Sequence, residues 1–548
     1  WLYWVHAFVV WGVVCAVQVQ IYGAQREFLR HRYQWLRRMG ELRANTVLVE
    51  GIPEECCSDE ALFQFFGNMF GSDKVKSAYV VKQTDNLLAA LAERDAAKAG
   101  IAESEAEERL GAGKRYCLCL RRAAGQQKLC YTEQEREANV AVKAERKKIQ
   151  NEMSICGGVN MTNGFVTFHE RTDAELAKSI EYSTDHDEWA VSTPPDPRMI
   201  LWDDLKQANS KQVGKEILGY GLMVGLYMGY LPAIVAITAF SKNVKLGPVL
   251  QPFWEGVAPT MGLQFMVAFL PTFILIILRE CFTLKADAWA QHKLQQWYFA
   301  FQVVFVILVT AIGSDVVLFA RTLLMESYAI FGVLAETMPI ATHFYMNFLV
   351  LQWVTHSSQM LRYVPLMKFM ALRKLYEDEE ARELSEPEDQ DYYGLGSRSA
   401  RWTINLLIGF IFSTLSPLVS LICLADFFIC RVVYGYLIPY AETRKPDLGG
   451  VFWVSQLEHI FSGLVIYVLV MGGVVYGRTG DPVQTGIIGL ALLYVVGSYY
   501  RFRTEFNWEK LPFPELKRHP AKVERMPLKF EQPELVEDSP TSGQSVKA

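Results

Sequence analysis

Long blocks of apolar residues without charge recur along the chain. A transmembrane helix needs about 20 apolar residues to cross the core of a bilayer. Proline removes a helix donor and clashes with the preceding turn, so Ser416-Pro417 predicts that the block at 402–440 folds into two passes. The blocks predict nine spans, at residues 1–25, 217–240, 259–278, 295–314, 338–359, 402–440 (two passes), 460–477 and 482–500.

The distribution of basic residues orients these spans. Basic residues gather in loops on the cytosolic side of membrane proteins. Five arginines follow the first block at once, which predicts a cytosolic end there and an N-terminus outside. Two passes in 402–440 then place the C-terminus in the cytosol. They also place four later arginines there: Arg431, Arg444, Arg501 and Arg503.

Residues 40–210 have a different pattern, that of a soluble α+β domain. Short β-rich runs occupy 46–53, 74–82, 164–170 and 188–192, and helical spacing occupies 59–70 and 171–183. Two charged helical stretches, about 85–110 and 132–155, lie between the second and third runs. The order predicts a cytosolic ferredoxin-like βαββαβ insert, which is also the fold of RNA-recognition domains, with an added helical hairpin.

RNA binding and a structural role are the two alternatives for this insert. The string GFVTF (164–168) resembles part of an RNA-contacting strand, but the basic-Gly-aromatic residues that precede it in such domains are absent. The run TVLVEGIP (46–53) offers no aromatic ring on which a base could stack. We therefore expect a structural or coupling role and no nucleic-acid partner.

The tip of the helical hairpin carries a basic loop at 113–122. Cys117 and Cys119 lie between two pairs of basic residues, beside Tyr116 and Leu118. A structural zinc site has four ligands at matched spacing, and Cys-x-Cys with the distant Cys130 is only a weak match to that pattern. A loop that touches an anionic bilayer, with or without palmitoylation, and an ordinary surface loop both remain open.

Composition narrows the classes of protein further. The 548 residues are 51% hydrophobic and 21% charged, with a net charge of −5 and ten cysteines, and the mean hydropathy is +0.11. A nucleic-acid-coating protein and a disulfide scaffold are both excluded. The chain has no phosphate-binding loop, dinucleotide fingerprint, HExxH or GxSxG motif. We expect neither an enzyme nor a cofactor.

Polar residues inside the predicted spans are the candidate functional groups, because they are costly in lipid and mark a pathway or a helix contact. The span 338–359 carries the most, and prolines interrupt four spans. Proline-broken, mildly polar helices favour a pore over a proton-coupled pump. The candidates are Gln264, Gln302, Thr342, His343, Asn347, Gln352, His356, Ser413, Ser416, Asp426, Glu458 and His459.

The chain therefore divides into four predicted parts. A first span covers 1–25, the cytosolic insert covers 40–210 and eight spans follow within 215–500. The proline-rich residues 506–548 contain few apolar runs and predict a mostly disordered cytosolic tail. The chain begins inside a hydrophobic block without an initiator methionine, so we expect further spans upstream.

Several strings resemble one family, the OSCA-type hyperosmolality-gated, calcium-permeable, stress-gated cation channels. The resemblance extends from Trp1 to about Pro514. The most specific string closes the insert just before a span, in the pattern PxPRxxxWxxL. The matching strings are TVLVEGIP (46–53), GFVTF (164–168), PDPRMILWDDL (195–205), the prolines Pro259 and Pro271, YFAFQ (298–302), Gly409 to Pro417, and Phe452-Trp453.

This resemblance implies an anoctamin-like bundle of eleven spans, of which this chain would hold the last nine. It implies a homodimer through the cytosolic domains, a pore in each subunit, and a membrane-dipping hook at about 111–131 that includes Tyr116, Cys117, Leu118 and Cys119. The implied pore helices are 217–240, 259–278, 295–314, 338–359 and 403–417. By position, Tyr298 and Phe301 fall at the narrow neck, with Ile340 and Phe344 facing them.

Three departures from the family pattern concern the pore. Gln264 stands where a lysine is expected, and Gln359 stands where an acidic residue is expected near the inner mouth. The inner part of the pore helix, residues 352–363, keeps Trp353 but has Thr355 and Ser358 in place of hinge glycines. Without glycine, this helix is expected to bend less easily.

The resulting hypothesis is a tension-gated or osmotically gated, poorly selective cation channel that passes Ca²⁺, K⁺ and Na⁺. Membrane lipids are expected partners, and the plasma membrane is the expected location, with an endomembrane as the alternative. A lipid scramblase of anoctamin-like fold is a second hypothesis. A membrane-anchored adaptor that binds RNA or another partner is a third.

Overall fold

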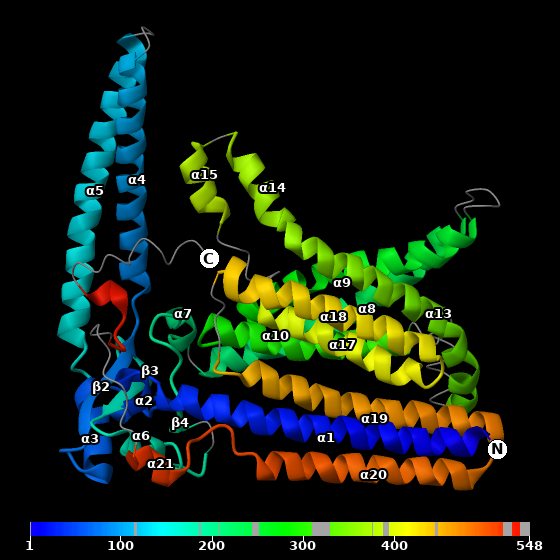
Figure 1. Ribbon diagram of the computed structural model, residues 1–548. Helices are drawn as coiled ribbons and strands as arrows, with labels where there is room; N and C mark the ends of the chain where they lie inside the picture. The colour runs from blue at the N-terminus through cyan, green and yellow to red at the C-terminus, as the bar shows by residue number, and fades with distance from the viewer. Residues whose placement is uncertain are drawn as a thin grey trace. The chain divides into compact units, whose positions relative to one another are not determined.

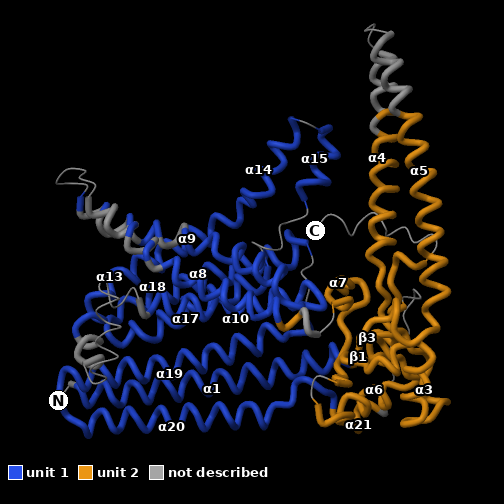
Figure 2. Tube along the Cα trace, turned by 180° about the vertical axis from the view of Figure 1, so that it is seen from behind, with its two compact units in different colours: residues 1–36, 214–511 blue, residues 37–213, 512–548 orange. Residues whose placement is uncertain are grey.

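The computed structural model describes residues 2–113, 118–185, 188–207, 209–243, 251–309, 329–374, 376–386, 394–443, 448–518 and 529–536. They form two compact units, shown in different colours in Figure 2. Unit 1 contains residues 1–36 and 214–511, and unit 2 contains residues 37–213 and 512–548. Unit 2 thus includes the insert expected at 40–210 and also the C-terminal end of the chain.

Unit 2 is built on a four-stranded antiparallel sheet with strand order β2-β3-β1-β4 (Figure 1). The strands are β1 (Thr46–Glu50), β2 (Val75–Lys82), β3 (Asn160–Phe168) and β4 (Ala190–Ser192). Helix α3 (Asp59–Phe70) connects β1 to β2, and α6 (Arg171–Ala177) follows β3. This element order is the predicted βαββαβ arrangement. The shorter elements are α2 (Glu41–Asn45), η1 (Glu54–Cys56) and α7 (Trp202–Leu205).

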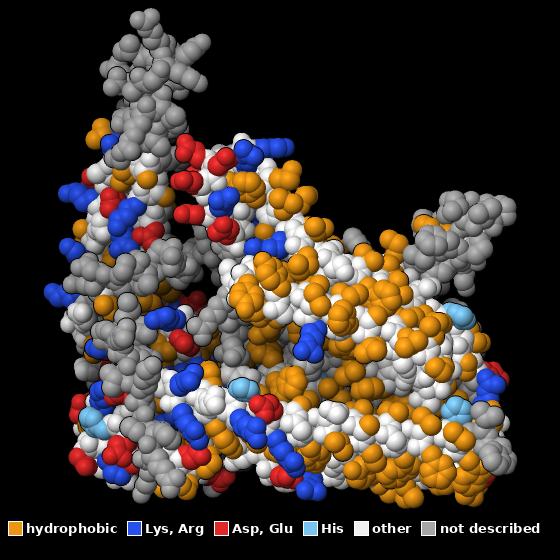
Figure 3. All heavy atoms as spheres, viewed as in Figure 1, with side chains coloured by type: hydrophobic (Ala, Val, Ile, Leu, Met, Phe, Trp, Pro, Cys, Tyr) orange, Lys and Arg blue, Asp and Glu red, His pale blue; other side chains and the backbone are white. Residues whose placement is uncertain are grey.

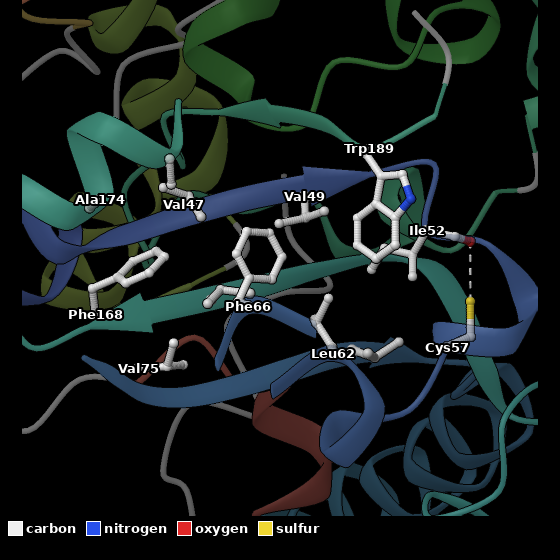
Figure 4. Close-up of a cluster of buried hydrophobic side chains, with 13 residues drawn as sticks. Val47, Val49, Ile52, Cys57, Leu62, Phe66, Val75, Phe168, Ala174 and Trp189 are labelled. Carbon is white, nitrogen blue, oxygen red and sulfur yellow. Dashed lines mark hydrogen bonds between the residues drawn. The ribbon is translucent and has the colours of Figure 1, made fainter. Parts of the chain in front are cut away.

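One face of the sheet packs on the helices through a continuous hydrophobic core (Figure 4). Phe66 of α3 and Phe168 of β3 are wholly buried and meet edge to face. Trp189 stacks on Phe65 with ring centroids 3.9 Å apart. Alternating residues of β1, such as Val47 and Val49, point into this core, as the strand period of two requires.

Cys57 lies in this core, and its thiol donates a hydrogen bond to the Ile52 carbonyl at 3.3 Å (Figure 4). Burial raises the pKa of the Cys57 thiol to about 11. Only about one thiol in a thousand is then ionised at pH 8, and the thiolate is the reactive form. We expect maleimide to modify Cys57 at least about 100-fold more slowly than the exposed Cys130.

Peptide mass mapping of the folded chain over a time course measures both rates. Denaturant should bring the two rates together. Equal rates in the native protein would contradict the packing of Cys57 in the core.

A long helical hairpin, α4 (Asp85–Gly113) and α5 (Leu118–Glu152), is inserted between β2 and β3. The two helices run side by side in Figures 1 and 2. Their base is held by a small apolar cluster that includes Leu87, Leu91, Val142 and Ile149. The hairpin leaves the sheet intact because it enters and leaves at adjacent strand ends.

Two segments of the C-terminal tail pack onto unit 2, so the expected disorder of 506–548 does not hold for them. Helix α21 (Phe513–Arg518) contacts α6, and Arg37 pairs with Glu515 at 2.6 Å. Farther on, residues 529–536 contain η5 (Pro533–Leu535) and run across β2. Few apolar residues are needed here, because tail side chains hydrogen-bond to the end of β2.

Gln532 is the centre of that attachment and is completely buried. Its side-chain oxygen accepts the Lys82 amide at 2.7 Å, and its side-chain nitrogen donates to the Lys82 carbonyl at 3.0 Å. Thr84 donates to the Glu534 carboxylate at 2.7 Å. One glutamine side chain thus extends the backbone pairing of β2.

Phe530 covers the second face of the sheet. It stacks on Phe165 of β3 with centroids 4.7 Å apart, and Trp202 meets the same ring edge on at 5.8 Å. Phe165 belongs to the GFVTF string that suggested RNA contact. Base stacking on Phe165 would therefore require Phe530 to leave.

Replacing Gln532 by alanine should detach the tail from β2. Leaving the Lys82 amide and carbonyl unpaired costs about 1–3 kcal/mol. Hydrogen–deuterium exchange of the full chain should show faster exchange at Lys82. Gln64→Ala on the exposed side of α3 is the matched control and should leave exchange unchanged. Unaltered protection of Lys82 in the Gln532→Ala variant would contradict the attachment.

Unit 1 is an all-helical bundle whose first helix is α1 (Leu2–Arg37). Its central helices are α8 (Asn209–Asn243), α9 (Gln251–Cys281), α10 (Asp287–Gln302), the π-helical η2 (Val303–Val309) and α13 (Ala329–Ser358). There follow η3 (Gln359–Leu361), α14 (Tyr363–Leu372), α15 (Asp378–Ser385), α17 (Leu395–Ser413), α18 (Pro417–Tyr436), η4 (Leu437–Ala441), α19 (Val451–Thr479) and α20 (Pro482–Glu505).

Helix α13 lies inside the bundle, packed on α9, α17, α18 and α19. Helices α1, α19 and α20 run side by side (Figures 1 and 2), and the Trp11 indole donates to the Ile487 carbonyl of α20 at 2.9 Å. Helices α10 and α17 approach closely at Gly396, where a Cβ would overlap the Gln291 carbonyl. Small residues of this kind allow close packing of membrane helices.

The predicted break in 402–440 is confirmed. Helix α17 ends at Ser413, and Pro417 is the first residue of α18. A proline fits the first helical turn because its missing N–H has no partner there in any case.

In the part of the chain that the structure describes, five helices are long and apolar enough to cross a membrane, by length and composition. They are 3–37, 260–281, 417–441, 451–479 and 482–505. Hydrophobic side chains gather on the outer surface of unit 1 in Figure 3, among them those of α18. Leu421, Leu424 and Phe428 of α18 are each more than 60% exposed, which suits a helix facing lipid. The count of nine spans stays a prediction.

Candidate functional site: the candidate pore

The candidate neck residues Tyr298 and Phe301 lie near the end of α10 and are both completely buried. The Tyr298 hydroxyl donates to the Val267 carbonyl of α9 at 3.0 Å. A buried tyrosine normally finds such a partner. This contact ties α10 to α9 at the level of the candidate neck.

Phe301 lies in a cluster of aromatic rings from α8, α10 and η2. Its centroid is 5.1 Å from Tyr227 and 4.6 Å from Tyr230, both edge on, and 4.4 Å from Phe305, which it stacks upon. Edge-to-face and offset contacts of this kind are favourable beyond the area they bury. The ring of Phe301 therefore fixes α8 against α10.

Gln302 follows this cluster and is 1% exposed. Its side-chain oxygen has no hydrogen-bond partner among the described residues. A buried amide oxygen without a partner costs about 1–3 kcal/mol. Such groups occur where water enters or where another conformation supplies the partner.

The π-helical segment η2 begins directly after Gln302. The Tyr345 hydroxyl of α13 lies 2.7 Å from the Val306 carbonyl and 2.8 Å from the Ile307 carbonyl, and its proton is shared between them. A π-helix changes the pattern of backbone bonds, and π-turns are frequent at functional sites. Tyr345 supplies part of the hydrogen bonding that this irregular backbone needs.

The middle of α13 carries three of the predicted neck and pore-lining residues: Ile340, Phe344 and Asn347. Ile340 is 76% exposed. Phe344 and Asn347 are partly buried, and the Phe344 ring meets Tyr345 edge on at 5.4 Å. An exposed Ile340 fits contact with lipid as well as contact with a water-filled pore. That Ile340 faces Phe301 therefore stays a prediction.

The C-terminal half of α13 is helical up to Ser358, including Thr355 and Ser358, the positions where hinge glycines were expected from the resemblance. The Trp353 indole donates to the Ile422 carbonyl of α18 at 3.2 Å. Thr355 and Ser358 donate to carbonyls of their own helix, at 3.0 and 2.8 Å. Their hydroxyls are thus satisfied locally and leave the helix intact.

Helix α13 ends at Ser358, and Gln359 begins η3. Gln359 is 3% exposed, and its side-chain oxygen has no partner in the described part of the chain. Arg362 then takes a left-handed conformation, with φ of 44°, and α14 begins. A non-glycine residue in that region of backbone space is strained. The change of direction therefore falls after Gln359 rather than within the pore helix.

For five of the candidate residues, the side chains are outside the part of the chain that the structure describes. Tyr116 and Cys117 of the hook are outside the described residues. Leu118 and Cys119 begin α5, and Gln264 lies in α9, but their side chains are outside the described part.

The sequence reasoning missed four aromatic residues that form the surroundings of the candidate neck: Tyr227, Tyr230, Phe305 and Tyr345. A signal for three of them was present, because residues three or four apart share a helix face. Tyr227 and Tyr230 are three apart, and Phe301 and Phe305 are four apart. Tyr345 had no such signal, since its partner is irregular backbone.

Apolar helices packed around α13, in a chain that also holds a separate α/β unit, define a multi-pass membrane protein. Two family models match it. "Cytosolic domain of 10TM putative phosphate transporter" matches residues 44–204, and "Calcium-dependent channel, 7TM region, putative phosphate" matches residues 223–475. The chain thus carries both domains of a channel-like or transporter-like family, and several curated relatives are named hyperosmolality-gated Ca²⁺ permeable channels.

Curated relatives agree with this assignment. The chain is 25% identical over 352 residues to "Uncharacterized protein RSN1" of Saccharomyces cerevisiae, covering 61% of this chain and 36% of the relative. It is 21% identical over 400 residues to "Hyperosmolality-gated Ca2+ permeable channel 1.8" of Arabidopsis thaliana, covering 70% and 49%. It is 24% identical over 367 residues to "CSC1-like protein ERD4" of Brassica juncea, covering 63% and 48%. The match thus spans half or less of the length of each of these relatives.

Proposed function

We propose that this chain forms a poorly selective cation channel that passes Ca²⁺, K⁺ and Na⁺ and opens under membrane tension. Family membership supports calcium permeation, because several Arabidopsis relatives are named as hyperosmolality-gated Ca²⁺ permeable channels. The channel would lie in the plasma membrane as a homodimer that meets through its cytosolic units. Lipids would contact the hook at Tyr116–Cys119.

The observation that carries this proposal is a pair of buried side-chain amides on the predicted pore helices, one beside the candidate neck and one near the predicted inner mouth. Gln302 and Gln359 each keep a side-chain oxygen without a partner among the described residues. In an apolar bundle such groups are retained where hydrated ions or water reach them in another state. Both lie on elements that the family resemblance implies as pore-lining.

The described conformation corresponds to a closed channel in this proposal. Tyr298 and Phe301 are fully buried, and the rings around Phe301 leave its own ring no solvent contact. Opening then requires α10 to separate from α8 at this cluster. Gln264, Ile340, Phe344 and Asn347 would line the widened path.

Tension favours whichever state occupies the larger area in the plane of the membrane. To move a population from 1% to 99% open, tension must contribute about 5.5 kcal/mol. Helix α13 contains Pro339 but has no further proline before it ends at Ser358, so the part after Pro339 would move largely as one rod. Tilt of such a rod is a direct way to change in-plane area.

The test uses the purified chain in liposomes loaded with a calcium-sensitive dye. We expect hypo-osmotic swelling to admit Ca²⁺ within seconds, and isotonic dilution to admit almost none. Empty liposomes with a calcium ionophore control for dye response. Exchange of labelled lipids between leaflets without entry of Ca²⁺ would contradict a channel and favour the scramblase hypothesis.

A further inference from the structure

A cluster of metal-ligating side chains lies inside unit 1, between α13 and α18, and the pore proposal does not use it. His356 comes from α13, and Asp426 and Cys430 come from one face of α18, four residues apart. One ligand atom from each lies within 4.8 Å of the other two. The three residues are 2%, 0% and 7% exposed.

Two of these ligand atoms have no hydrogen-bond partner among the described residues. They are His356 Nε2 and Asp426 Oδ1. They lie 3.8 Å apart, which is too far for a hydrogen bond between them. Two buried, unsatisfied polar atoms thus point at the same place, next to the Cys430 sulfur.

Neighbouring side chains hold both groups in this orientation. The Tyr434 hydroxyl lies 2.8 Å from His356 Nδ1, and Asn405 Nδ2 donates to Asp426 Oδ2 at 2.9 Å. A histidine that donates from Nδ1 to Tyr434 presents the lone pair of Nε2 to the centre of the cluster. Metal-binding histidines and carboxylates are commonly oriented by contacts of this kind.

The charges also balance around a divalent cation. A carboxylate and a thiolate carry two negative charges, and one divalent ion neutralises both. Two cations lie near the cluster, Arg401 and Arg398. Arg398 is held by Glu442 in a two-point contact at 2.7 and 2.8 Å, and Arg401 Nε donates to the Ser397 carbonyl at 3.4 Å. A neutral cluster suits burial in an apolar bundle far better than an isolated carboxylate does.

We propose that His356, Asp426 and Cys430 form a binding site for a zinc-type transition-metal ion that joins α13 to α18. Imidazole and thiolate ligands favour zinc over Ca²⁺ and Mg²⁺, which prefer oxygen. Ligand atoms of a tetrahedral zinc site lie about 3.4–3.6 Å apart, from bonds of about 2.0–2.3 Å. The observed spacing needs a movement of about 1 Å or less to reach this geometry, and a fourth position stays open for water.

Cobalt(II) is the probe, because a cysteine-bound Co²⁺ absorbs in the near ultraviolet and a tetrahedral one absorbs in the visible. The purified full chain is stripped with a chelator in detergent and titrated with Co²⁺. We expect one equivalent to bind with both bands, and Zn²⁺ to displace it. Cys430→Ser should remove the thiolate band. Asp426→Asn replaces a proposed ligand and should weaken binding by at least the roughly 10- to 100-fold that loss of an outer-shell partner costs.

Cys281→Ser is the matched control, since Cys281 is also 7% exposed but lies at the end of α9, outside the cluster. It should titrate like the unmodified chain. Thermal unfolding without metal identifies any variant that fails to fold. If a variant fails to fold, the titration of the unmodified chain still tests the proposal. Absence of both cobalt bands in the unmodified chain, or their survival in folded Cys430→Ser, would overturn the proposal. The measurement does not depend on transport activity.

Discussion

Replacing Arg398 by alanine should lower the free energy of unfolding of the purified chain by about 3–5 kcal/mol. The guanidinium and the Glu442 carboxylate are 1% and 3% exposed and form two hydrogen bonds, at 2.7 and 2.8 Å. Arg398 also lies over the Tyr434 ring, 5.2 Å from its centroid. The substitution leaves a buried carboxylate without its cation, at the point where the start of α17 meets the end of η4, which continues from α18. Denaturation in detergent, followed by tryptophan fluorescence, measures the loss.

An exposed ion pair provides the control for this prediction. Arg373 and Asp378 are 2.8 Å apart, with side chains 60% and 67% exposed. Water screens such pairs, so Arg373→Ala should cost less than about 1 kcal/mol. Equal losses for Arg398→Ala and Arg373→Ala would mean that the buried pair does not hold the two helices together.

Replacing Phe301 by alanine should favour the open channel, because the aromatic cluster that holds α8 against α10 is lost. Removing a buried phenylalanine ring costs about 3–5 kcal/mol of packing in the conformation that buries it. The gating equilibrium responds to the part of this cost that destabilises the closed state and not the open state. Each 1.4 kcal/mol of that part raises the ratio of open to closed channels about tenfold. We therefore expect Ca²⁺ entry into isotonic liposomes to rise at least about tenfold.

A second buried phenylalanine separates this effect from general loosening. Phe461 of α19 is 2% exposed and packs on Tyr499 and Phe502, outside the implied pore helices. Phe461→Ala should lower stability to a similar extent and leave isotonic Ca²⁺ entry at the level of the unmodified chain. Comparable Ca²⁺ leaks through both variants would show that Phe301 does not form the neck.

The secondary structure of unit 2 was predictable because local patterns and tertiary packing agree there. The runs at 46–53 and 74–82 became β1 at 46–50 and β2 at 75–82, and the helical spacing at 59–70 became α3 over the same residues. Alternating apolar residues fit a strand with one face in the core, whichever partners the strand finds. The tail was not predictable in this way. Gln532 has no hydrophobic signal, and its attachment depends on an amide that pairs with the backbone of β2.

The candidate pore was predictable only in part. The break before Pro417 follows from the chemistry of proline, which acts locally. The ring contacts of Phe301 depend on how α8 and α10 pack, and no residue of either helix specifies that alone. The cluster of His356, Asp426 and Cys430 joins residues more than 60 positions apart in the sequence. Their polarity was visible in the sequence, but their proximity was not.

Patch recording from liposomes that contain only this chain tests the proposed channel most directly. Suction applied to an excised patch should evoke currents that grow with tension. Their reversal potential should be that of a cation conductance, and they should persist when Ca²⁺ is the sole permeant cation. Patches from protein-free liposomes should stay silent under the same suction. Silence of the protein-containing patches up to the tension at which the membrane ruptures, with correctly folded protein in the bilayer, would contradict a tension-gated channel.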